Sequence, residues 1–356
     1  MDSQRLDSLR SEFPPRDLDA LLVSALPNIR YLTGFTGSNG LLLIWPESAI
    51  LLTDPRYAIQ ARAETRVRVR VVRGPLIKVA LSIIKRNKLK TIGFESSRIV
   101  HDTFAALSRE LPLGATLEPT QGLVEGLRMV KSPVEVDRIR QAVETNSAAF
   151  AATIGHLSPG VREYELAAEL EHQMRRLGAE SAAFETIALS GSNTALPHGH
   201  PSAKPLQDNE LVLIDMGARR SGYTSDMTRM VFLGRPSDRV RRLYGAVLEA
   251  QLAALSVVRD GVRAEAVDRA ARQVLGKHGL EKQFVHSTGH GLGLEIHEPP
   301  RLGRREKAKL KAGMVVTVEP GVYLEGFCGI RIEDTVLVTR TGCEVLTPTT
   351  KELVTV

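Results

Sequence analysis

Four acidic residues, Asp215, Asp226, Glu319 and Glu333, each stand inside a short apolar run with the composition of a buried β-strand. A carboxylate loses hydration when it is buried, so it needs a partner that restores the lost free energy. His290, in a glycine-rich segment, offers a fifth group that can bind a cation. Any fold of this chain must therefore bring these groups around a shared charge, and divalent metal ions suit such a mixture of carboxylates and imidazole.

The first two acids lie on neighbouring strand-like segments, 211–218 and 224–233, which are joined through residues 219–222. If those residues form the loop of a hairpin, Asp215 and Asp226 face each other directly, with Cβ atoms about 4.5–5.5 Å apart. Two carboxylates that close repel each other unless a proton or a cation lies between them. The serine and glycine that end the loop favour a turn. The spacing therefore predicts a pair of acids on one hairpin.

The other two acids follow the same plan on the segments 314–319 and 329–336, with Gly326 between them. Glu319 and Glu333 are separated by an even number of positions. A short loop with an odd number of residues therefore places them opposite each other in an antiparallel pair. The spacing predicts a second pair of acids on a second hairpin.

Taken singly, each acid has an ordinary alternative: Asp226 could lie in a turn, and Glu333 could pair with Arg331. The joint occurrence of four such acids favours a metal site. Carboxylates with one imidazole suit Mn²⁺, Co²⁺, Fe²⁺ and Zn²⁺ better than copper or an iron–sulfur cluster. Two such ions could activate a water molecule.

His290 is surrounded by glycines at positions 289, 291 and 293. Glycine lets the backbone approach other groups closely and adopt unusual dihedral angles. The segment is not a phosphate-binding loop, because it lacks the lysine followed by serine or threonine that such loops carry. We interpret the glycines as residues that clear space over a substrate.

The first part of the chain has the pattern of a small α/β domain, which we place at residues 1–124. Arginines at 66, 68 and 70 alternate with valines, which predicts a half-exposed strand. Further strands are predicted at 20–24, 40–44, 49–53 and 91–94.

The second part, residues 125–356, begins with strong helix signals. Ser132 is a favourable N-cap, followed by Pro133 in the first turn and Glu135 at the third position. A second helix is predicted over 162–177, ended by Gly178.

This part also repeats itself. Gly160-Val161-Arg162 recurs as Gly261-Val262-Arg263, and Gly178 corresponds to Gly279 after the next helix. Each helical block is then followed by a strand pair that carries two of the acids. The shared spacing favours a duplicated α/β unit in which each half supplies one pair.

Composition limits the class of protein. Hydrophobic residues make up 43% and charged residues 25%, as in ordinary soluble proteins. No apolar run approaches the roughly 20 residues that span a bilayer, and the polar N-terminus lacks a signal-peptide core. We therefore expect a cytoplasmic protein without a membrane partner.

A positive net charge, here +6, is also a feature of proteins that bind nucleic acid. The basic residues are dispersed among separate segments, and aromatic residues are only 4%, so a stacking platform is lacking. We interpret the basic segments as solvated faces and expect no nucleic acid partner. Cys328 and Cys343 lack a disulfide-framework pattern and are expected to be reduced thiols.

These motifs together resemble the metallopeptidases of the pita-bread fold, in particular the Xaa-Pro peptidases aminopeptidase P and prolidase. The matching segments are LIDMGA, TSDMTR, TGHGLGLEIHE, TVEPG and RIEDT. The segments 31–38 and 53–57 resemble the creatinase-type N-terminal domain of those peptidases. The resemblance implies an α/β (α+β) protein, with a creatinase-like α/β domain over 1–124 and a pita-bread catalytic domain with pseudo-two-fold symmetry over 125–356.

The resemblance implies a role for each of the five residues. Asp215 would bind one metal, Asp226 and Glu333 would bridge two metals, and His290 and Glu319 would complete the other site. Glu319 would also act as general base. The ions are expected to be two divalent metals, Mn²⁺ before Co²⁺, Zn²⁺ or Fe²⁺.

Three more positions match the family around that centre. His198 aligns with a histidine that contacts the scissile region and assists proton transfer. His297 aligns with one that binds the substrate carbonyl and steadies the tetrahedral intermediate, and Arg331 aligns with an arginine that supports the site. We expect His278 to favour the C-terminal end of its helix, and we interpret His156, His172 and His286 as structural.

The implied reaction is hydrolysis of the bond before proline, a tertiary amide without an N–H, which general peptidases bind poorly. We favour an Xaa-Pro aminopeptidase that releases the N-terminal residue. The alternative is an Xaa-Pro dipeptidase (prolidase) restricted to dipeptides, and a minor alternative is a non-catalytic pita-bread binding module. Proline-containing peptides and a second copy in a homodimer are the expected partners.

Overall fold

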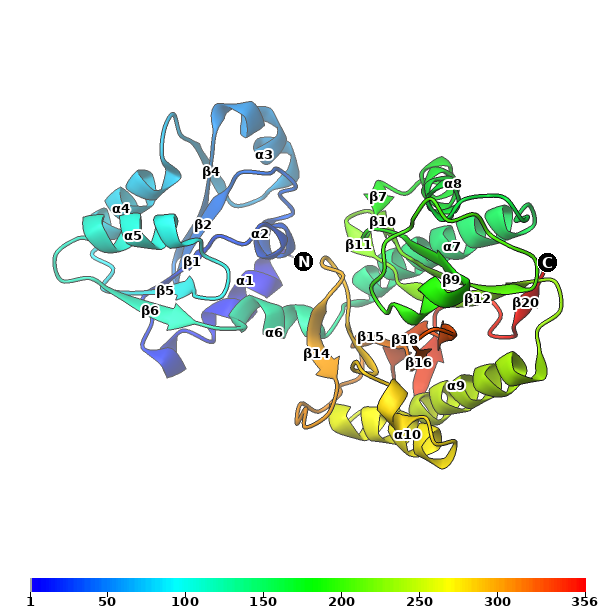
Figure 1. Ribbon diagram of the computed structural model, residues 1–356. Helices are drawn as coiled ribbons and strands as arrows, with labels where there is room; N and C mark the ends of the chain where they lie inside the picture. The colour runs from blue at the N-terminus through cyan, green and yellow to red at the C-terminus, as the bar shows by residue number, and fades with distance from the viewer. Residues whose placement is uncertain (1) are drawn as a thin grey trace. The chain divides into compact units, whose positions relative to one another are not determined.

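The short apolar segments of the first part pair into one six-stranded sheet, in the order β4-β3-β2-β1-β5-β6 (Figure 1). The computed structural model describes residues 2–356. The strands are β1 (Ala20–Val23), β2 (Leu41–Trp45), β3 (Ser48–Thr53), β4 (Arg68–Val71), β5 (Thr91–Glu95) and β6 (Thr116–Thr120). The four strands predicted here and the arginine–valine strand are confirmed. β4 lies at an edge, where exposed arginines hinder pairing with another strand.

Helices cover this sheet, and α4 packs an apolar face made of Ile77, Ala80, Leu81 and Ile84 against it. The helices of this part are α1 (Asp2–Arg10), α2 (Leu26–Thr33), α3 (Ala58–Glu64), α4 (Leu76–Arg86), α5 (His101–Glu110) and α6 (Leu123–Met129). Residues up to Arg128 form one compact unit and Met129–Val356 form the other. No helix among residues 2–356 is both long and apolar enough to cross a membrane.

The second unit begins with α7 (Pro133–Ile154), which has the capping box predicted at its start. The Ser132 hydroxyl and main-chain N–H both donate to the Glu135 carboxylate, at 2.8 and 3.0 Å. The predicted second helix is α8 (Glu163–Arg176). The remaining helices are α9 (Asp238–Val257) and α10 (Ala264–Lys277).

The strands of the second unit form antiparallel sheets, apart from the short parallel partner β20 (Val354–Thr355). The first half contributes β7 (Ser181–Ala182), β8 (Ile187–Ser190), β9 (Glu210–Met216), β10 (Ala218–Arg220), β11 (Tyr223–Thr224) and β12 (Met227–Leu233). The second half contributes β13 (Gly289–Gly291), β14 (Glu298–Leu302), β15 (Val315–Val318), β16 (Gly321–Leu324), β17 (Cys328–Arg331), β18 (Asp334–Val338) and β19 (Cys343–Val345).

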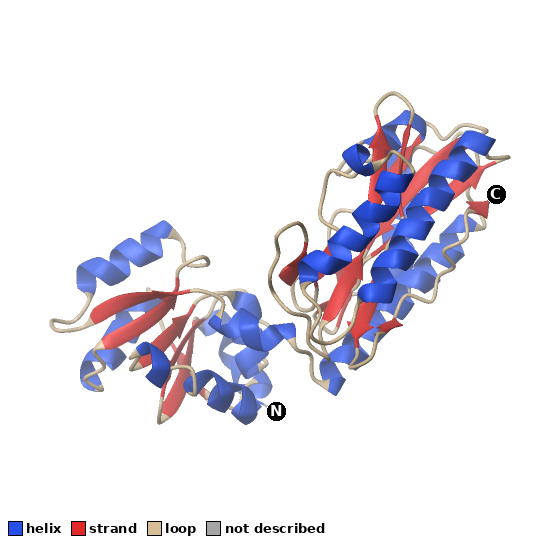
Figure 2. Cartoon of the chain, turned by 90° about the horizontal axis from the view of Figure 1, so that it is seen from below, coloured by secondary structure: helices blue, strands red, loops and turns tan. Residues whose placement is uncertain are grey.

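Both faces of the central strand β9 are buried, which explains its continuous apolar sequence. Leu211 and Leu213 pack into a core with α9 and α10, whereas Val212 and Ile214 pack into a core with α7 and α8. Alternate side chains of a strand point to opposite faces, so the helices on both sides require apolar residues at the successive positions 211–214. Figure 2 shows the long helices running alongside these strands.

Matching backbone contacts confirm the predicted repeat. The N–H of Gly160 donates to the carbonyl of Leu206, and the N–H of Gly261 donates to the carbonyl of Leu310. Gly178 and Gly279, which follow α8 and α10, have φ angles of 99° and 72°. Glycine is favoured there because these angles lie in the left-handed region.

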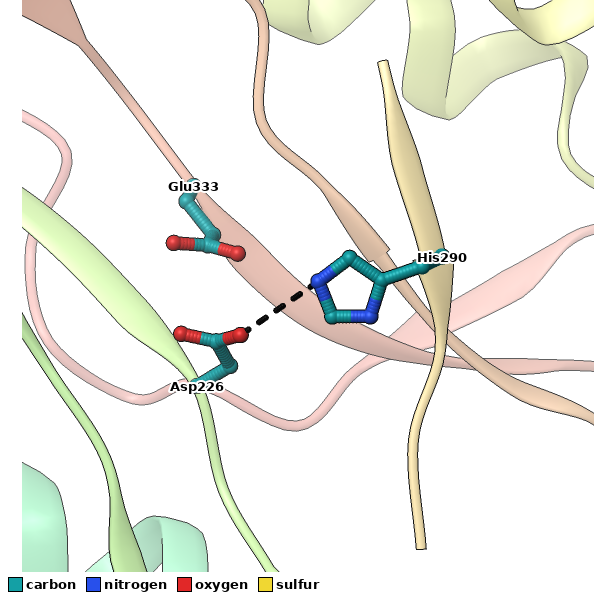
Figure 3. A group of neighbouring side chains, drawn as sticks. All are labelled: Asp226, His290 and Glu333. Carbon is teal, nitrogen blue, oxygen red and sulfur yellow. Dashed lines mark ion pairs between the residues drawn. The ribbon is translucent and has the colours of Figure 1, made fainter. Parts of the chain in front are cut away.

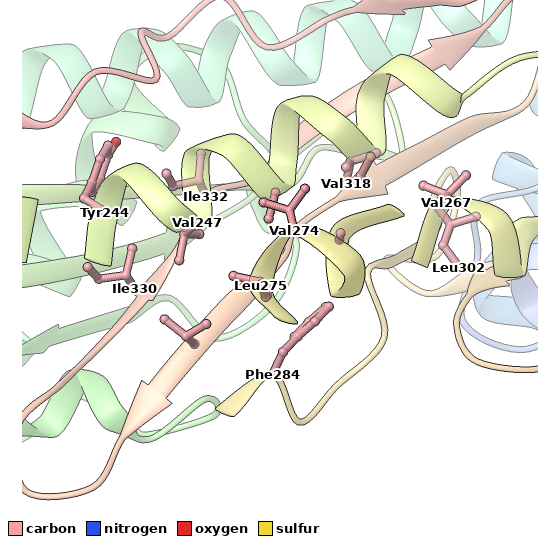
Figure 4. Close-up of a cluster of buried hydrophobic side chains, with 14 of the residues drawn as sticks. Tyr244, Val247, Val267, Val274, Leu275, Phe284, Leu302, Val318, Ile330 and Ile332 are labelled. Atoms are coloured by element: carbon pink, nitrogen blue, oxygen red, sulfur yellow. The ribbon is translucent and has the colours of Figure 1, made fainter. Parts of the chain in front are cut away.

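The core beneath α9 and α10 yields a test of stability (Figure 4). Leu275 on α10 is fully buried in this core. We expect Leu275→Ala to lower the free energy of unfolding by about 2–5 kcal/mol, since it leaves a cavity. Leu252 on α9 is 49% exposed, so Leu252→Ala serves as the control and should change stability by about 0.5 kcal/mol or less. Urea denaturation measures both, and equal losses would contradict the packing described.

Candidate metal centre

The first hairpin carries Asp215 and Asp226 in a register that differs from the prediction. Asp215 lies opposite Thr228, and Met216 lies opposite Met227. Asp215 and Asp226 are therefore not directly opposite, as the sequence predicted, but offset by two positions. An offset of two keeps side chains on the same face of a ladder.

The reason for the offset lies in the turn. The pairing continues through β10 and β11, where Arg219 faces Thr224 and Arg220 faces Tyr223. Only Ser221 and Gly222 remain in the loop, with φ angles of 52° and 79°. Two-residue turns with positive φ at both positions match the twist of a hairpin, so the strands pair closer to the turn than a four-residue loop would allow.

The second hairpin has the predicted register. Val318 lies opposite Asp334 in β15 and β18, and Gly321 lies opposite Arg331 in β16 and β17. Both pairs share one register, so Glu319 and Glu333, between the two ladders, occupy facing positions. The loop beyond β16 contains the predicted odd number of residues, centred on Gly326.

The glycines around His290 have a different role from the predicted one. A Cβ added at Gly289 would lie 2.0 Å from the carbonyl oxygen of Thr317, and one at Gly291 would lie 2.4 Å from that of Pro299. These positions are tight against neighbouring strands. The interpretation that they clear space over a substrate is wrong at these two positions, since only glycine allows the strands beside His290 to approach this closely.

Three of the predicted ligands converge, His290 from β13 and Asp226 and Glu333 from the positions just before β12 and β18 (Figure 3). Asp226, His290 and Glu333 offer ligand atoms that all lie within 4.8 Å of one another. The His290 Nε2 atom is 3.6 Å from Asp226 Oδ2 and 3.5 Å from Glu319 Oε1. Its Nδ1 atom lies 2.9 Å from the carbonyl oxygen of Gly291. If Nδ1 carries the proton and donates to that carbonyl, Nε2 is free to bind a cation.

Asp215, the remaining predicted ligand, is paired with Arg331. Arg331 Nη2 donates to Asp215 Oδ2 at 2.5 Å, and Arg331 Nε donates to the Thr228 hydroxyl at 3.0 Å. That hydroxyl donates to Glu333 Oε2 at 2.7 Å. Arg331 therefore connects acids from both halves of the domain.

One atom of this group remains without a partner. Asp215 Oδ1 is buried and accepts no hydrogen bond from the residues that the structure describes. A buried carboxylate oxygen normally finds a donor or a cation. Among residues 2–356, only the Arg331 guanidinium pairs with a carboxylate of these four acids, so the cluster has less positive than negative charge. The orphaned oxygen and the unbalanced charge both fit a site for divalent cations bound by oxygen and imidazole.

The pKa values show the same deficit of positive charge. Burial, and then repulsion from Glu333, holds the pKa of Asp226 well above its ordinary value. Burial, and then repulsion from Glu319, likewise holds the pKa of Glu333 well above its ordinary value. Burial raises the pKa of Glu319 to about 7, although Arg331 opposes the change. Burial lowers the pKa of His290, which favours the neutral ring that binds metals.

The acids lie in a cavity of about 780 Å³, which also contains the other predicted site residues His198, His297 and Arg331. The His297 ring packs edge-on against His290, with ring centroids 4.5 Å apart. His198 and His297 are exposed on the cavity wall, whereas Arg331 is buried beneath it. All the predicted site residues thus border one cavity.

The cavity contains residues that sequence reasoning did not select. His286, interpreted as structural, lines the wall, and its Nε2 lies 2.9 Å from the hydroxyl of Tyr323. Arg331 Nη1 donates to the same hydroxyl at 2.6 Å. Arg301 also lines the cavity, and its side chain makes no hydrogen bond or ion pair with the residues that the structure describes. The sequence around Arg301, Glu-Pro-Pro-Arg-Leu, carries no alternation of polar and apolar residues that would have indicated its place on the cavity wall.

Two known protein families together match nearly the whole chain. Residues 137–340 match metallopeptidase family M24, and residues 5–130 match the creatinase/prolidase N-terminal domain. The chain is 35% identical to the Xaa-Pro dipeptidase of Pyrococcus horikoshii, over 95% of each chain.

Solved structures agree with this likeness. The fold superposes on the Xaa-Pro dipeptidase from Bacillus anthracis with a TM-score of 0.97 and 37% identity, over 100% of both chains. It superposes on the X-Pro aminopeptidase from Thermotoga maritima with a TM-score of 0.90 and 39% identity, over 96% of this chain and 98% of that one.

The raised acid pKa values predict how metal removal affects stability. The pKa of Glu319 is about 7 in the folded protein against an ordinary value of 4.5, so the folded state holds more protons between these values. The contribution of Glu319 to stability should therefore be greatest below the lower pKa and should fall as pH rises toward the higher one. We expect chelator-treated protein to melt at a lower temperature at about pH 8 than at about pH 5.

Calorimetry with and without Mn²⁺ measures this effect. Added metal should raise the melting temperature more at the higher pH, because the acids must lose protons to bind it. Glu319→Gln, which removes one of the titrating groups, should weaken the pH dependence. A melting temperature of the metal-free protein that rises between these two pH values would contradict the assignment.

Proposed function

The chain belongs to metallopeptidase family M24 and is a metallo-exopeptidase, and we propose that its substrates are Xaa-Pro dipeptides. The relatives named Xaa-Pro dipeptidase, from Pyrococcus horikoshii and Bacillus anthracis, match over nearly the full length of both chains. This full-length likeness carries the proposal. It supports the dipeptidase alternative better than the aminopeptidase favoured from the sequence.

A feature of the cavity also favours short substrates. Arg301, which lies opposite His290 in the pairing of β13 with β14, places an exposed side chain on the cavity wall. In a dipeptide the proline carries the free carboxylate, and a guanidinium binds a carboxylate through paired hydrogen bonds. A longer peptide has no carboxylate at this position. Recognition of that carboxylate by Arg301 would therefore select dipeptides.

We propose that two divalent ions, Mn²⁺ first among the candidates, are held by Asp215, Asp226, His290, Glu319 and Glu333. Asp226 and Glu333 would bridge the ions, consistent with their convergence on His290. When bound, the ions would lower the pKa of a water molecule and polarise the scissile carbonyl. Metal identity also depends on supply in the cell.

The residues around the centre would perform separate tasks. Glu319 would accept a proton from the attacking water. His297, held against the His290 ring, would donate a hydrogen bond to the substrate carbonyl oxygen. His198, on the cavity wall, would assist proton transfer at the scissile bond. Arg331 would hold Asp215 in place through its short hydrogen bond. Homodimerisation and a cytoplasmic location stay predictions from the sequence.

The bridging role of Asp226 is tested by Asp226→Asn, which keeps the side-chain shape and removes a charged ligand. We expect kcat/KM for an Xaa-Pro dipeptide to fall by more than about 100-fold, since loss of even an outer partner of a metal site commonly costs about 10- to 100-fold. Bound metal, measured by elemental analysis, should fall as well. Asp208→Asn, at an exposed turn before β9, is the control. Retained activity in Asp226→Asn would refute the role.

Substrate length is tested with Xaa-Pro dipeptides, the same dipeptides with an amidated C-terminus, and Xaa-Pro-Xaa tripeptides. We expect kcat/KM to be highest for the free dipeptide. Arg301→Met should lower kcat/KM for that substrate about 10- to 100-fold, mainly through KM, since a charged hydrogen bond contributes about 1.5–3 kcal/mol. Arg301→Met should change cleavage of the amide little.

Arg304→Met provides a matched control, because Arg304 lies nearby but pairs with Glu281 at 3.0 Å and does not line the cavity of the acids. Cleavage of tripeptides as fast as dipeptides would favour the second candidate, an Xaa-Pro aminopeptidase. The observation that supports this second candidate is the likeness to the Thermotoga maritima X-Pro aminopeptidase, at 39% identity.

A further inference from the structure

His198 is held by its loop and not by its own side chain. The ring is exposed on the wall of the cavity and makes no hydrogen bond or ion pair with any residue that the structure describes. Its place relative to the acids therefore depends on residues 190–202, the segment that we term the His198 loop. Whatever holds this loop decides where the imidazole lies.

One buried carboxylate binds both ends of the His198 loop. Glu163, the first residue of α8, is fully buried. Its Oε1 accepts hydrogen bonds from the main-chain N–H and the hydroxyl of Ser190, at 2.7 and 2.9 Å. Its Oε2 accepts hydrogen bonds from the main-chain N–H and the hydroxyl of Ser202, at 3.0 and 2.6 Å. Asn193 donates to both oxygens. The carboxylate thus joins the start and the end of the loop.

The middle of the His198 loop is attached to the second hairpin, the one that carries Glu319 and Glu333. The N–H of Gly329 donates to the Thr194 hydroxyl at 2.8 Å, and Arg331 Nη1 donates to the carbonyl oxygen of Pro197 at 3.2 Å. Pro197 directly precedes His198. With its ends on α8 and its middle on β17, the loop is restrained on both sides of the histidine.

We propose that Glu163 is a positioning residue for the reaction, which acts by holding His198 at the cavity wall. The proposal rests on the proposed role of His198 in proton transfer. Glu163 does not line the cavity, so a substitution of Glu163 does not remove a direct contact with the substrate. A displacement of about 1 Å in a catalytic group can lower a rate about 100-fold, so a residue that sets its position affects kcat without touching the substrate.

A structural role for Glu163 alone is the competing interpretation. Glu163 also lies at the start of α8, where a negative charge stabilises a helix. Glu165, in the same first turn, carries the same charge but accepts a hydrogen bond only from the main-chain N–H of Arg162, at 2.9 Å. It makes no hydrogen bond to the His198 loop among the residues that the structure describes. Glu165→Gln is therefore a matched control for charge and helix position.

The experiment compares Glu163→Gln, Glu163→Ala, Ser202→Ala and Glu165→Gln in the metal-loaded full chain with an Xaa-Pro dipeptide. Glutamine keeps the size of the side chain but has a single acceptor oxygen, so it can hold only one end of the loop. We expect kcat to fall about 10-fold in Glu163→Gln and about 100-fold in Glu163→Ala, with KM and bound metal little changed. Ser202→Ala removes one hydrogen bond and should show a smaller loss in a folded protein. Glu165→Gln should match the unsubstituted protein.

A double-mutant cycle with His198→Ala distinguishes positioning from a general structural effect. If Glu163 acts through His198, Glu163→Gln should change kcat by less than about twofold once His198 is absent. An equal loss in both backgrounds, or an unchanged kcat in both Glu163→Gln and Ser202→Ala, would overturn the proposal. A His198→Ala protein with unchanged kcat would instead overturn the role of His198, whatever Glu163 does.

Discussion

Mutual repulsion among buried acids is the constraint on which the rest of this structure depends. Asp215, Asp226, Glu319 and Glu333 lie near Arg331, the one guanidinium among residues 2–356 that pairs with a carboxylate of this group. Burial and mutual repulsion raise the pKa values of three of them, so the fold holds these groups where they would otherwise be unstable. The burial of apolar side chains in the surrounding cores must offset the free-energy cost of bringing these acids together. Bound cations would lower that cost.

The duplicated architecture provides that support. Each half supplies a helix pair, a hairpin and two acids, and the hairpins are joined by hydrogen bonds such as that from Thr228 to Glu333. Each half also uses a buried acid to hold a loop near the cavity. Glu163 holds the loop of His198, and Asp268 on α10 accepts hydrogen bonds from Thr288, two residues before His290. Rigid helices thereby position residues that lie in loops or directly beside them.

How much of the site could be predicted depended on the range of the contacts. The register of Glu319 and Glu333 followed from an odd loop centred on Gly326, because that centre leaves one solution. The register of Asp215 and Asp226 did not, because a two-residue turn and a four-residue loop are both compatible with the segment 219–222. The glycines beside His290 were identified as special, but the strands that approach them come from elsewhere in the chain.

By itself, the sequence determined the chemistry of the centre and its division between two similar halves. The features that carried this prediction are local: acids in apolar strands, a capping box at Ser132 and a repeated glycine spacing. Each can be recognised in the sequence without knowledge of the tertiary structure. Only the tertiary structure decided that Arg331 bonds to Asp215, which is 116 positions away, that Glu163 closes the His198 loop, and that Arg301 faces the cavity. These contacts join residues from different elements, so they depend on how strands and helices pack and not on any spacing along the chain.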